Sequence, residues 1–175
     1  MSVQTSFGQG TAFECNIVDT LRYAGYDVIH DKSLVSDYLT AKSKDKTPKH
    51  TQIDMMVVSD KVYVLEVKSS KVIYGNYDEQ SWQYGSTEAA MRTRTSAYLQ
   101  NLMHMQALRK LLKDTEWKDI EIVSLIVVPD CSHIKSNVTE FCEVSDCKFR
   151  IGEPKKNPEL YQYLLNNLSE IKEVL

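Results

Sequence analysis

The sequence has no apolar run that approaches the roughly 18 residues needed to cross a bilayer, so we expect no membrane-spanning helix. Its first residues show no basic stretch followed by an apolar core, which is the pattern of a secretory signal. We therefore expect a cytoplasmic location. There is also no excess of basic residues, since the net charge is −3, and this excludes a protein that coats nucleic acid non-specifically. A local basic groove is compatible with that charge.

The sequence has no glycine-rich phosphate-binding loop either, because Gly8-Gln9-Gly10 is too short and does not follow an expected strand. Internal repeats, low-complexity tracts and clear linkers are absent as well. The chain has 175 residues, of which 42% are hydrophobic, and these values fit one domain, 1–175, with a sizeable core.

Only four cysteines are present, and in a reducing compartment we expect free thiols. Three of them and one histidine are candidates for a zinc site: Cys131, His133, Cys142 and Cys147. Their spacing is not the common zinc-knuckle pattern, and small buried thiols in strands explain the cysteines equally well. A nucleophilic cysteine–histidine pair is a weaker alternative, because nothing in the sequence ties Cys15 or Cys131 to His30 or His104.

Hydrophobic periodicity predicts three long helices and several strands. The helices are expected at 11–24, from 87 or 96 to 113, and from 157 to 171 within a helical tail of about 153–175. The strands are expected at 26–30, 53–58, 62–67, 71–75 and 120–128, with one or two more in 139–151. We expect 71–75 to continue the meander of the two strands before it, and 76–85 to be a loop. This order predicts an α/β fold in which helices pack against a central mixed sheet.

The most informative stretch is the hairpin predicted from the second and third strands, which carries charges where an ordinary buried strand has none. If its turn has three residues, Val58 pairs with Val62 and Asp54 lies directly opposite Glu66. Residues paired in this way point to the same face, with Cβ atoms roughly 5 Å apart. Lys68 is two residues beyond Glu66 and therefore shares that face. The sequence thus predicts that two carboxylates and one ammonium group meet.

The charges of this hairpin indicate a specific chemistry. Two opposed carboxylates repel each other unless a cation lies between them. Carboxylate oxygens suit the hard cations Mg²⁺ and Mn²⁺. A lysine beside such a cation can orient or activate a water molecule and stabilise negative charge on a phosphate. The hairpin therefore carries the minimum equipment for metal-assisted phosphodiester hydrolysis. The alternative, from the hairpin alone, is a half-exposed surface with an ordinary cross-strand ion pair.

Motifs outside the hairpin complete a pattern that is more specific than any single piece. The pattern comprises Gly10 and Glu14, Gln52-Ile53-Asp54, Glu66-Val67-Lys68, Trp82, and Gln100, Asn101, His104 and Leu108. In this combination the chain resembles the nuclease-related (NERD) domain of the PD-(D/E)XK nuclease superfamily over about residues 8–128. One departure precedes Gln100, where the family usually carries Asn-Pro and this chain has Thr95-Ser96-Ala97. Residues 152–175 lie outside the resemblance.

The resemblance implies a restriction-endonuclease-like core and a Mg²⁺- or Mn²⁺-dependent nuclease that acts on DNA. It implies that Asp54 and Glu66 bind the metal, with a carbonyl oxygen, that of Val67, completing the ligand shell. Glu14, on the first helix, is implied as a further metal or water ligand.

The resemblance also implies roles for residues around the metal. Lys68 would position the attacking water, and Gln100 would orient the scissile phosphate or Lys68 itself. Lys49, Arg92 and Arg94 are the expected phosphate contacts. The resemblance leaves a homodimer open, since many enzymes of this superfamily dimerise to cut both strands. The alternative function is a catalytically weak or inactive module that binds nucleic acid or a partner protein.

Overall fold

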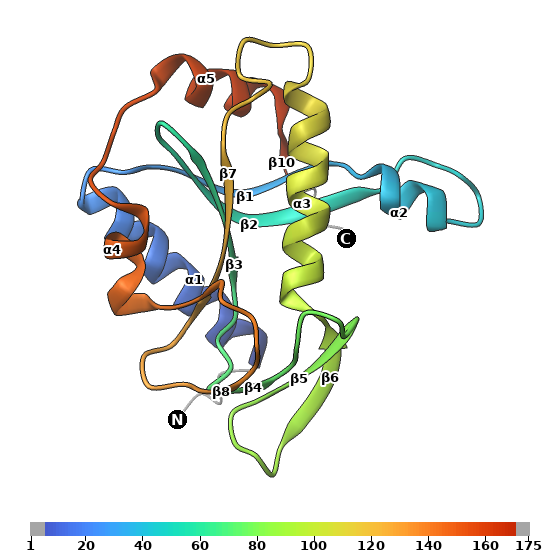
Figure 1. Ribbon diagram of the computed structural model, residues 1–175, viewed down its shortest axis with the longest axis vertical. Coiled ribbons are helices and arrows are strands. Elements are labelled where there is room, and N and C mark those ends of the chain that lie inside the picture. The colour runs from blue at the N-terminus through green and yellow to red at the C-terminus, as the bar shows by residue number, and fades with distance from the viewer. Residues whose placement is uncertain (1–5, 171–175) are drawn as a thin grey trace.

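The computed structural model describes residues 6–170, whose strands form two sheets (Figure 1). The larger sheet has the order β10-β1-β2-β3-β7-β9, with the bounds Ser169–Glu170, Asp27–Val35, His50–Val58, Val62–Val67, Ile122–Val128 and Phe141–Glu143. Its first four strands pair antiparallel, whereas β3, β7 and β9 pair parallel. The predicted α/β fold with a central mixed sheet is therefore confirmed.

Helices cover both faces of the larger sheet and bury two separate apolar clusters. One face carries α1 (Ser6–Tyr23) and α4 (Cys147–Ile151), and the other carries α3 (Ala97–Leu112) and α5 (Pro158–Asn167). Neighbouring residues of β2 show the division, because Met55 packs in the cluster of α1 and Met56 packs in the cluster of α3. This alternation is the strand periodicity that the sequence predicts.

A second sheet of four strands lies beside the N-terminal end of α3 (Figure 1). Its order is β6-β5-β4-β8, with the bounds Met91–Thr95, Ser81–Gly85, Val72–Tyr74 and His133–Lys135. The prediction that 71–75 continues the meander is wrong, because β4 pairs with β5 and β8 instead of β3. The prediction that 76–85 is a loop is wrong for its last five residues, which form β5. In this strand Trp82 and Tyr84 are buried and the residues between and before them are exposed. Strand β6 lacks an apolar alternation and is held by its pairing with β5.

Capping residues set the ends of two helices. Ser96 is the N-cap of α3, and its Oγ accepts a hydrogen bond from the amide of Leu99, so a helix start without Asn-Pro is accounted for. Asn157 caps α5 in the same way, and this helix ends at Asn167, before the predicted 171. Leu168 is the C-cap of the helix and is followed by the short β10. The rest of the predicted tail, 171–175, lies outside the described residues.

Two other boundaries differ from the predicted ones. Strand β1 continues to residue 35 instead of ending at 30, because it pairs along its length with β2. The segment 139–151 contains one strand, β9, followed by a 3₁₀ turn (Val144–Asp146) and α4. A short helix, α2 (Asp37–Lys42), follows β1. Among residues 6–170, no helix is long and apolar enough to cross a membrane.

Asn101 fastens α3 to the larger sheet from a fully buried position. Its Nδ2 donates to the main-chain oxygens of Val64 on β3, at 3.3 Å, and of Leu125 on β7, at 3.1 Å. It also donates to Oγ of Ser124 at 2.8 Å. One amide group therefore fixes where the first turns of α3 lie over two central strands.

Replacing Asn101 by alanine is expected to lower the free energy of unfolding by about 1–3 kcal/mol, because buried acceptors lose their donor. Urea denaturation followed by circular dichroism measures this change. Gln106→Ala, at an exposed position of the same helix, is the control and should change the free energy by less than about 0.5 kcal/mol. Equal stability of Asn101→Ala and the wild type would contradict the anchoring role.

Candidate active site

A cavity of about 460 Å³ opens at the end of the larger sheet, where β2 and β3 separate. The predicted hairpin register is confirmed, with Val58 opposite Val62, and the paired residues end with Met55 opposite Leu65. Strands β2 and β3, helices α1 and α3 and the smaller sheet contribute to the wall. Its lining includes Glu14, Asp54, Glu66, Val67, Lys68, Arg94 and Gln100. The structure thus brings all the predicted catalytic and metal-binding residues to one cavity.

Asp54 lies one position beyond the last paired residue of β2 and reaches across to β3. Its Oδ2 accepts a hydrogen bond of 2.8 Å from the main-chain amide of Val67. Burial raises the pKa of Asp54 above its ordinary value, although the Val67 amide and the charge of Lys68 act in the opposite direction. The carboxylate of Asp54 therefore links β2 to β3 at the point where the two strands separate.

Glu66 is 4% exposed, and its two carboxylate oxygens face different groups. Oε1 lies 3.1 Å from Nζ of Lys68, whereas Oε2 has no hydrogen-bond partner among the described residues. Burial, and next the negative charge of Asp54, raise the pKa of Glu66 to about 8 despite the charge of Lys68. Lys68 also lies over the ring of Tyr84, with Nζ 5.4 Å from the ring centroid. Lys68 therefore forms an ion pair with Glu66, and its charge also lowers the pKa of Asp54.

Glu14 reaches the cavity from α1 and meets two residues of β1 that sequence reasoning missed. Nε2 of His30 lies 2.9 Å from Oε1 of Glu14 and 3.3 Å from Oδ2 of Asp31. Burial, and then the charges of Asp54 and Asp31, raise the pKa of Glu14 to about 8. Within residues 6–170, this trio is the one group of three or more histidine, cysteine and carboxylate side chains that could share a metal ion.

Three carboxyl groups line this cavity, where Lys68 and Arg94 supply the positive charge. Burial raises the pKa of Glu14, Asp54 and Glu66, and the charge of Asp54 further raises the pKa values of Glu14 and Glu66. Oε2 of Glu66 is buried without a partner among residues 6–170. A cluster of oxygen donors with an unpaired buried carboxylate atom fits a hard divalent cation.

The raised carboxyl pKa values predict that the metal-free protein loses stability as the pH rises. Glu14 and Glu66 go from an ordinary value of 4.5 to about 8, so between these pH values the folded state binds more protons than the unfolded state. The free energy of unfolding therefore falls through this window. The pKa of His104 is lowered from 6.5 to about 4, which gives the opposite slope below pH 6.5. Between pH 6.5 and 8 the fall is unopposed by that histidine.

In calorimetry with EDTA, the melting temperature of the wild type should thus drop by several degrees between pH 6.5 and 8. Glu66→Gln removes one of the titrating groups and should flatten the profile, and saturating Mn²⁺ should flatten the wild-type profile. A melting temperature that rises over this interval in the wild type would contradict the burial of ionisable carboxyl groups here.

Helix α3 closes the cavity with Gln100 and carries His104 one turn further on. Oε1 of Gln100 and Nδ1 of His104 are buried, and neither has a hydrogen-bond partner among the described residues. Nδ1 of His104 lies 3.8 Å from Oε2 of Glu66. Burial, and next the charge of Lys68, lower the pKa of His104 to about 4. His104 was not among the predicted site residues, although it occupies the buried stripe of its helix.

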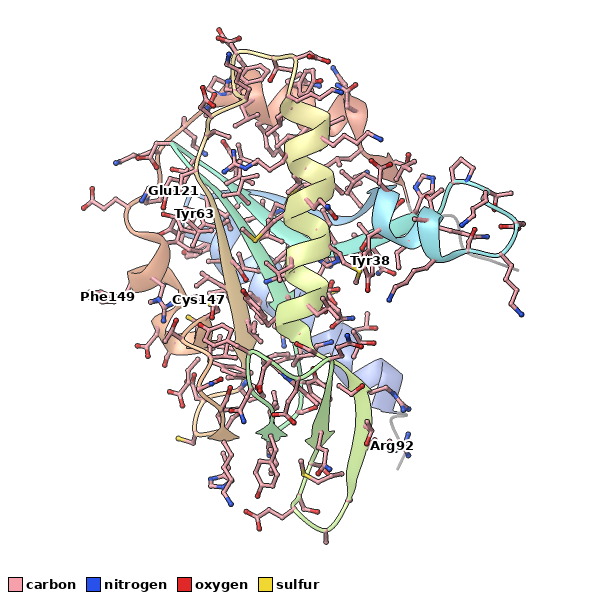
Figure 2. All side chains as sticks on the ribbon, turned by 45° about the vertical axis from the view of Figure 1, so that its right-hand side comes forward. Tyr38, Tyr63, Arg92, Glu121, Cys147 and Phe149 are labelled. Atoms are coloured by element: carbon pink, nitrogen blue, oxygen red, sulfur yellow. The ribbon has the colours of Figure 1, made fainter. Side chains whose placement is uncertain are left out.

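The predicted phosphate contacts do not gather at one place. Both arginines of β6 are exposed, and Arg94 lines the cavity whereas Arg92, two residues earlier, does not. Figure 2 shows Arg92 at the outer side of β6. Lys49 lies near α2, where its Nζ is 3.7 Å from Asp45 and its amide donates to Oγ1 of Thr40. Neither Lys49 nor Arg92 lines the cavity, because each belongs to a segment that leads away from it.

The zinc alternative is contradicted by the positions of its four residues. Cys142 and Cys147 are buried, with their sulfur atoms 3.7 Å apart. Cys131 is exposed, and Nε2 of His133 lies 3.5 Å from Glu88 on the smaller sheet. These side chains do not form a group that could share a metal ion. The two strands that carry His133 and Cys142 belong to different sheets, which keeps the ligands apart.

The mixed sheet, the helices on both faces and the carboxylate cavity define a nuclease-like α/β protein. Comparison with protein-family models matches residues 9–129 to the nuclease-related domain, NERD. Because the match covers more than half of the chain, the protein belongs to this family. The matched segment includes every residue named above as lining the cavity and ends before β8. Searches of characterised proteins and of solved structures found no significant match.

Proposed function

We propose that this chain is a metal-dependent nuclease that hydrolyses phosphodiester bonds, with DNA as its substrate. The observation that carries the proposal is the meeting of Asp54, Glu66 and Lys68 at one cavity, in a member of a nuclease-related family. Two carboxylates and a lysine are the groups that metal-assisted phosphodiester hydrolysis needs.

Asp54 and Glu66 would hold Mg²⁺ or Mn²⁺, with the carbonyl oxygen of Val67 and the carboxylate of Glu14 as further ligands. The donor set is made of oxygens, which these cations prefer. When bound, the cation supplies a Lewis acid for the phosphoryl group and makes a water molecule more acidic. Charge balance supports this assignment, because the pKa values of all three lining carboxyl groups are raised although Lys68 and Arg94 lie in the same wall.

The chain's own polar groups then act on the water and the phosphate. Lys68 presents Nζ at the carboxylate of Glu66, where it orients the attacking water and stabilises the charge that develops on the phosphate. Gln100 lines the cavity from α3, where its amide NH₂ donates to the phosphate or its unpaired amide oxygen accepts a hydrogen bond from Lys68. Arg94 lies on the wall formed by β6 and binds a neighbouring phosphate.

Cleavage assays test the proposal with supercoiled plasmid, single-stranded DNA and RNA of the same sequence. Each is incubated with the wild type and with Mg²⁺, Mn²⁺ or EDTA. The proposal predicts cleavage of DNA that requires the cation. Binding of nucleic acid with no cation-dependent cleavage would overturn it in favour of a module that binds without cutting. Cleavage of RNA and not of DNA would support the proposed hydrolysis and contradict DNA as the substrate.

A further inference from the structure

His104 occupies a position that the proposed chemistry does not yet use. It is 3% exposed, lies on the buried stripe of α3, and faces Glu66, which is 4% exposed. Nδ1 of His104 and Oε2 of Glu66 are 3.8 Å apart, and each is buried without a hydrogen-bond partner in residues 6–170. Buried polar atoms are rarely left unpaired in native proteins, so two that face each other indicate a functional contact.

This contact joins α3 to β3 near the point where β2 and β3 stop pairing, because His104 lies on α3 and Glu66 on β3. The carboxylate of Glu66 only accepts hydrogen bonds, so the proton that links the two atoms belongs on Nδ1 of His104.

The two oxygens of the Glu66 carboxylate face different groups. Oε2 points to the helix and to His104, which leaves Oε1 beside Nζ of Lys68 at the cavity. A separation of 3.8 Å is longer than a direct hydrogen bond. Hydrogen bonds of active sites are often long in the unliganded protein and shorten in the loaded complex.

We propose that His104 is a positioning residue, whose Nδ1–H holds Oε2 of Glu66 so that the other carboxylate oxygen, Oε1, is presented to the cation. This inference rests on the proposed function, because it assigns Glu66 to the metal. Partners that orient metal-binding carboxylates typically contribute 10–100-fold to metal affinity. His104 acts through Glu66 and does not itself touch the substrate.

Calorimetric titration of the purified full chain with Mn²⁺ tests this role, together with the melting temperature in EDTA. His104→Ala should weaken Mn²⁺ binding roughly 10–100-fold. His104→Asn places an amide near the position of Nδ1 and should recover most of the affinity. His104→Gln places its amide near the position of Nε2 instead of Nδ1 and should recover less. His133→Gln makes the same change at an exposed histidine away from the cavity and should bind as the wild type does.

The outcomes separate this inference from the function it rests on. A folded His104→Ala protein that binds Mn²⁺ within about twofold of the wild type would overturn the positioning role, since an orienting partner contributes more than that. Equal losses in all three His104 variants, in step with their melting temperatures, would also overturn it and show a purely structural residue. A wild type that binds no Mn²⁺ while Glu66→Gln behaves identically would overturn the proposed function itself.

Discussion

Replacing Lys68 by methionine should lower the rate of Mn²⁺-dependent DNA cleavage about 10²–10³-fold, which is the usual effect of removing one group that stabilises transition-state charge. Methionine keeps the length of the apolar stem over Tyr84 and removes only the ammonium group that lies 3.1 Å from Glu66. Because the charge of Lys68 lowers the pKa of Glu66, the two proteins are compared at saturating Mn²⁺, where both hold the cation.

Single-turnover cleavage of a labelled oligonucleotide at saturating Mn²⁺ measures this effect. Lys71→Met provides the matched control, because Lys71 is an exposed lysine three residues later that does not line the cavity. The control should cleave at the wild-type rate. If Lys68→Met cleaves within a few-fold of the wild type, the lysine has no part in the chemical step and its ion pair with Glu66 is structural.

Replacing Asp54 by asparagine should abolish metal binding and cleavage together. Asparagine retains an oxygen that can accept the hydrogen bond from the amide of Val67, so the fork between β2 and β3 remains bridged. The negative charge is lost, and the affinity for Mn²⁺ should fall by more than the roughly 100-fold that is typical of an outer partner of a metal site. In EDTA the variant should melt at a higher temperature than the wild type at pH 8, because Glu14 and Glu66 lose a repelling neighbour.

This combination of lost affinity and gained stability distinguishes a ligand from a structural residue. Titration calorimetry and thermal melting of Asp54→Asn measure the two effects on one preparation. Asp78→Asn, at an exposed turn, is the control and should leave both unchanged. A variant that melts lower in EDTA and binds Mn²⁺ as the wild type does would place the cation elsewhere.

The hairpin and its charges could be predicted because the relevant constraints are local. A three-residue turn fixes the register of two neighbouring strands, and alternation then assigns Asp54, Glu66 and Lys68 to one place. The capping residues Ser96 and Asn157 likewise lie next to the helix starts that they determine. Recognition of the family added Glu14 and Gln100, which no local rule connects to the hairpin.

The smaller sheet could not be predicted because its order depends on pairing between distant segments. Strand β4 pairs with β8, about sixty residues later in the chain, and nothing within either segment specifies that partner. Strand β6 is polar and exposed, so it lacks the alternation that identifies a strand. Its position matters for function, because it brings Arg94 to the cavity and carries Arg92 away from it.

His104 belongs to the recognised family pattern but was given no role in the site, although its place on the helix carried a signal. Asn101 and His104 occupy the same buried stripe of α3 as Leu108 and Leu112. Polar side chains at apolar positions of an amphipathic helix must find buried partners, and both lie over the central strands. His30 and Asp31 carried less information, because the left-handed backbone of Asp31, with φ of 52°, is not evident in the sequence.

A crystal structure of the protein soaked with Mn²⁺, with anomalous data collected at the manganese edge, tests the central claim most directly. The account predicts an anomalous peak between Asp54 and Glu66, within about 2.0–2.3 Å of a carboxylate oxygen of each residue. At saturating Mn²⁺, no peak in the cavity, or a peak ligated solely by Glu14, His30 and Asp31, would contradict it.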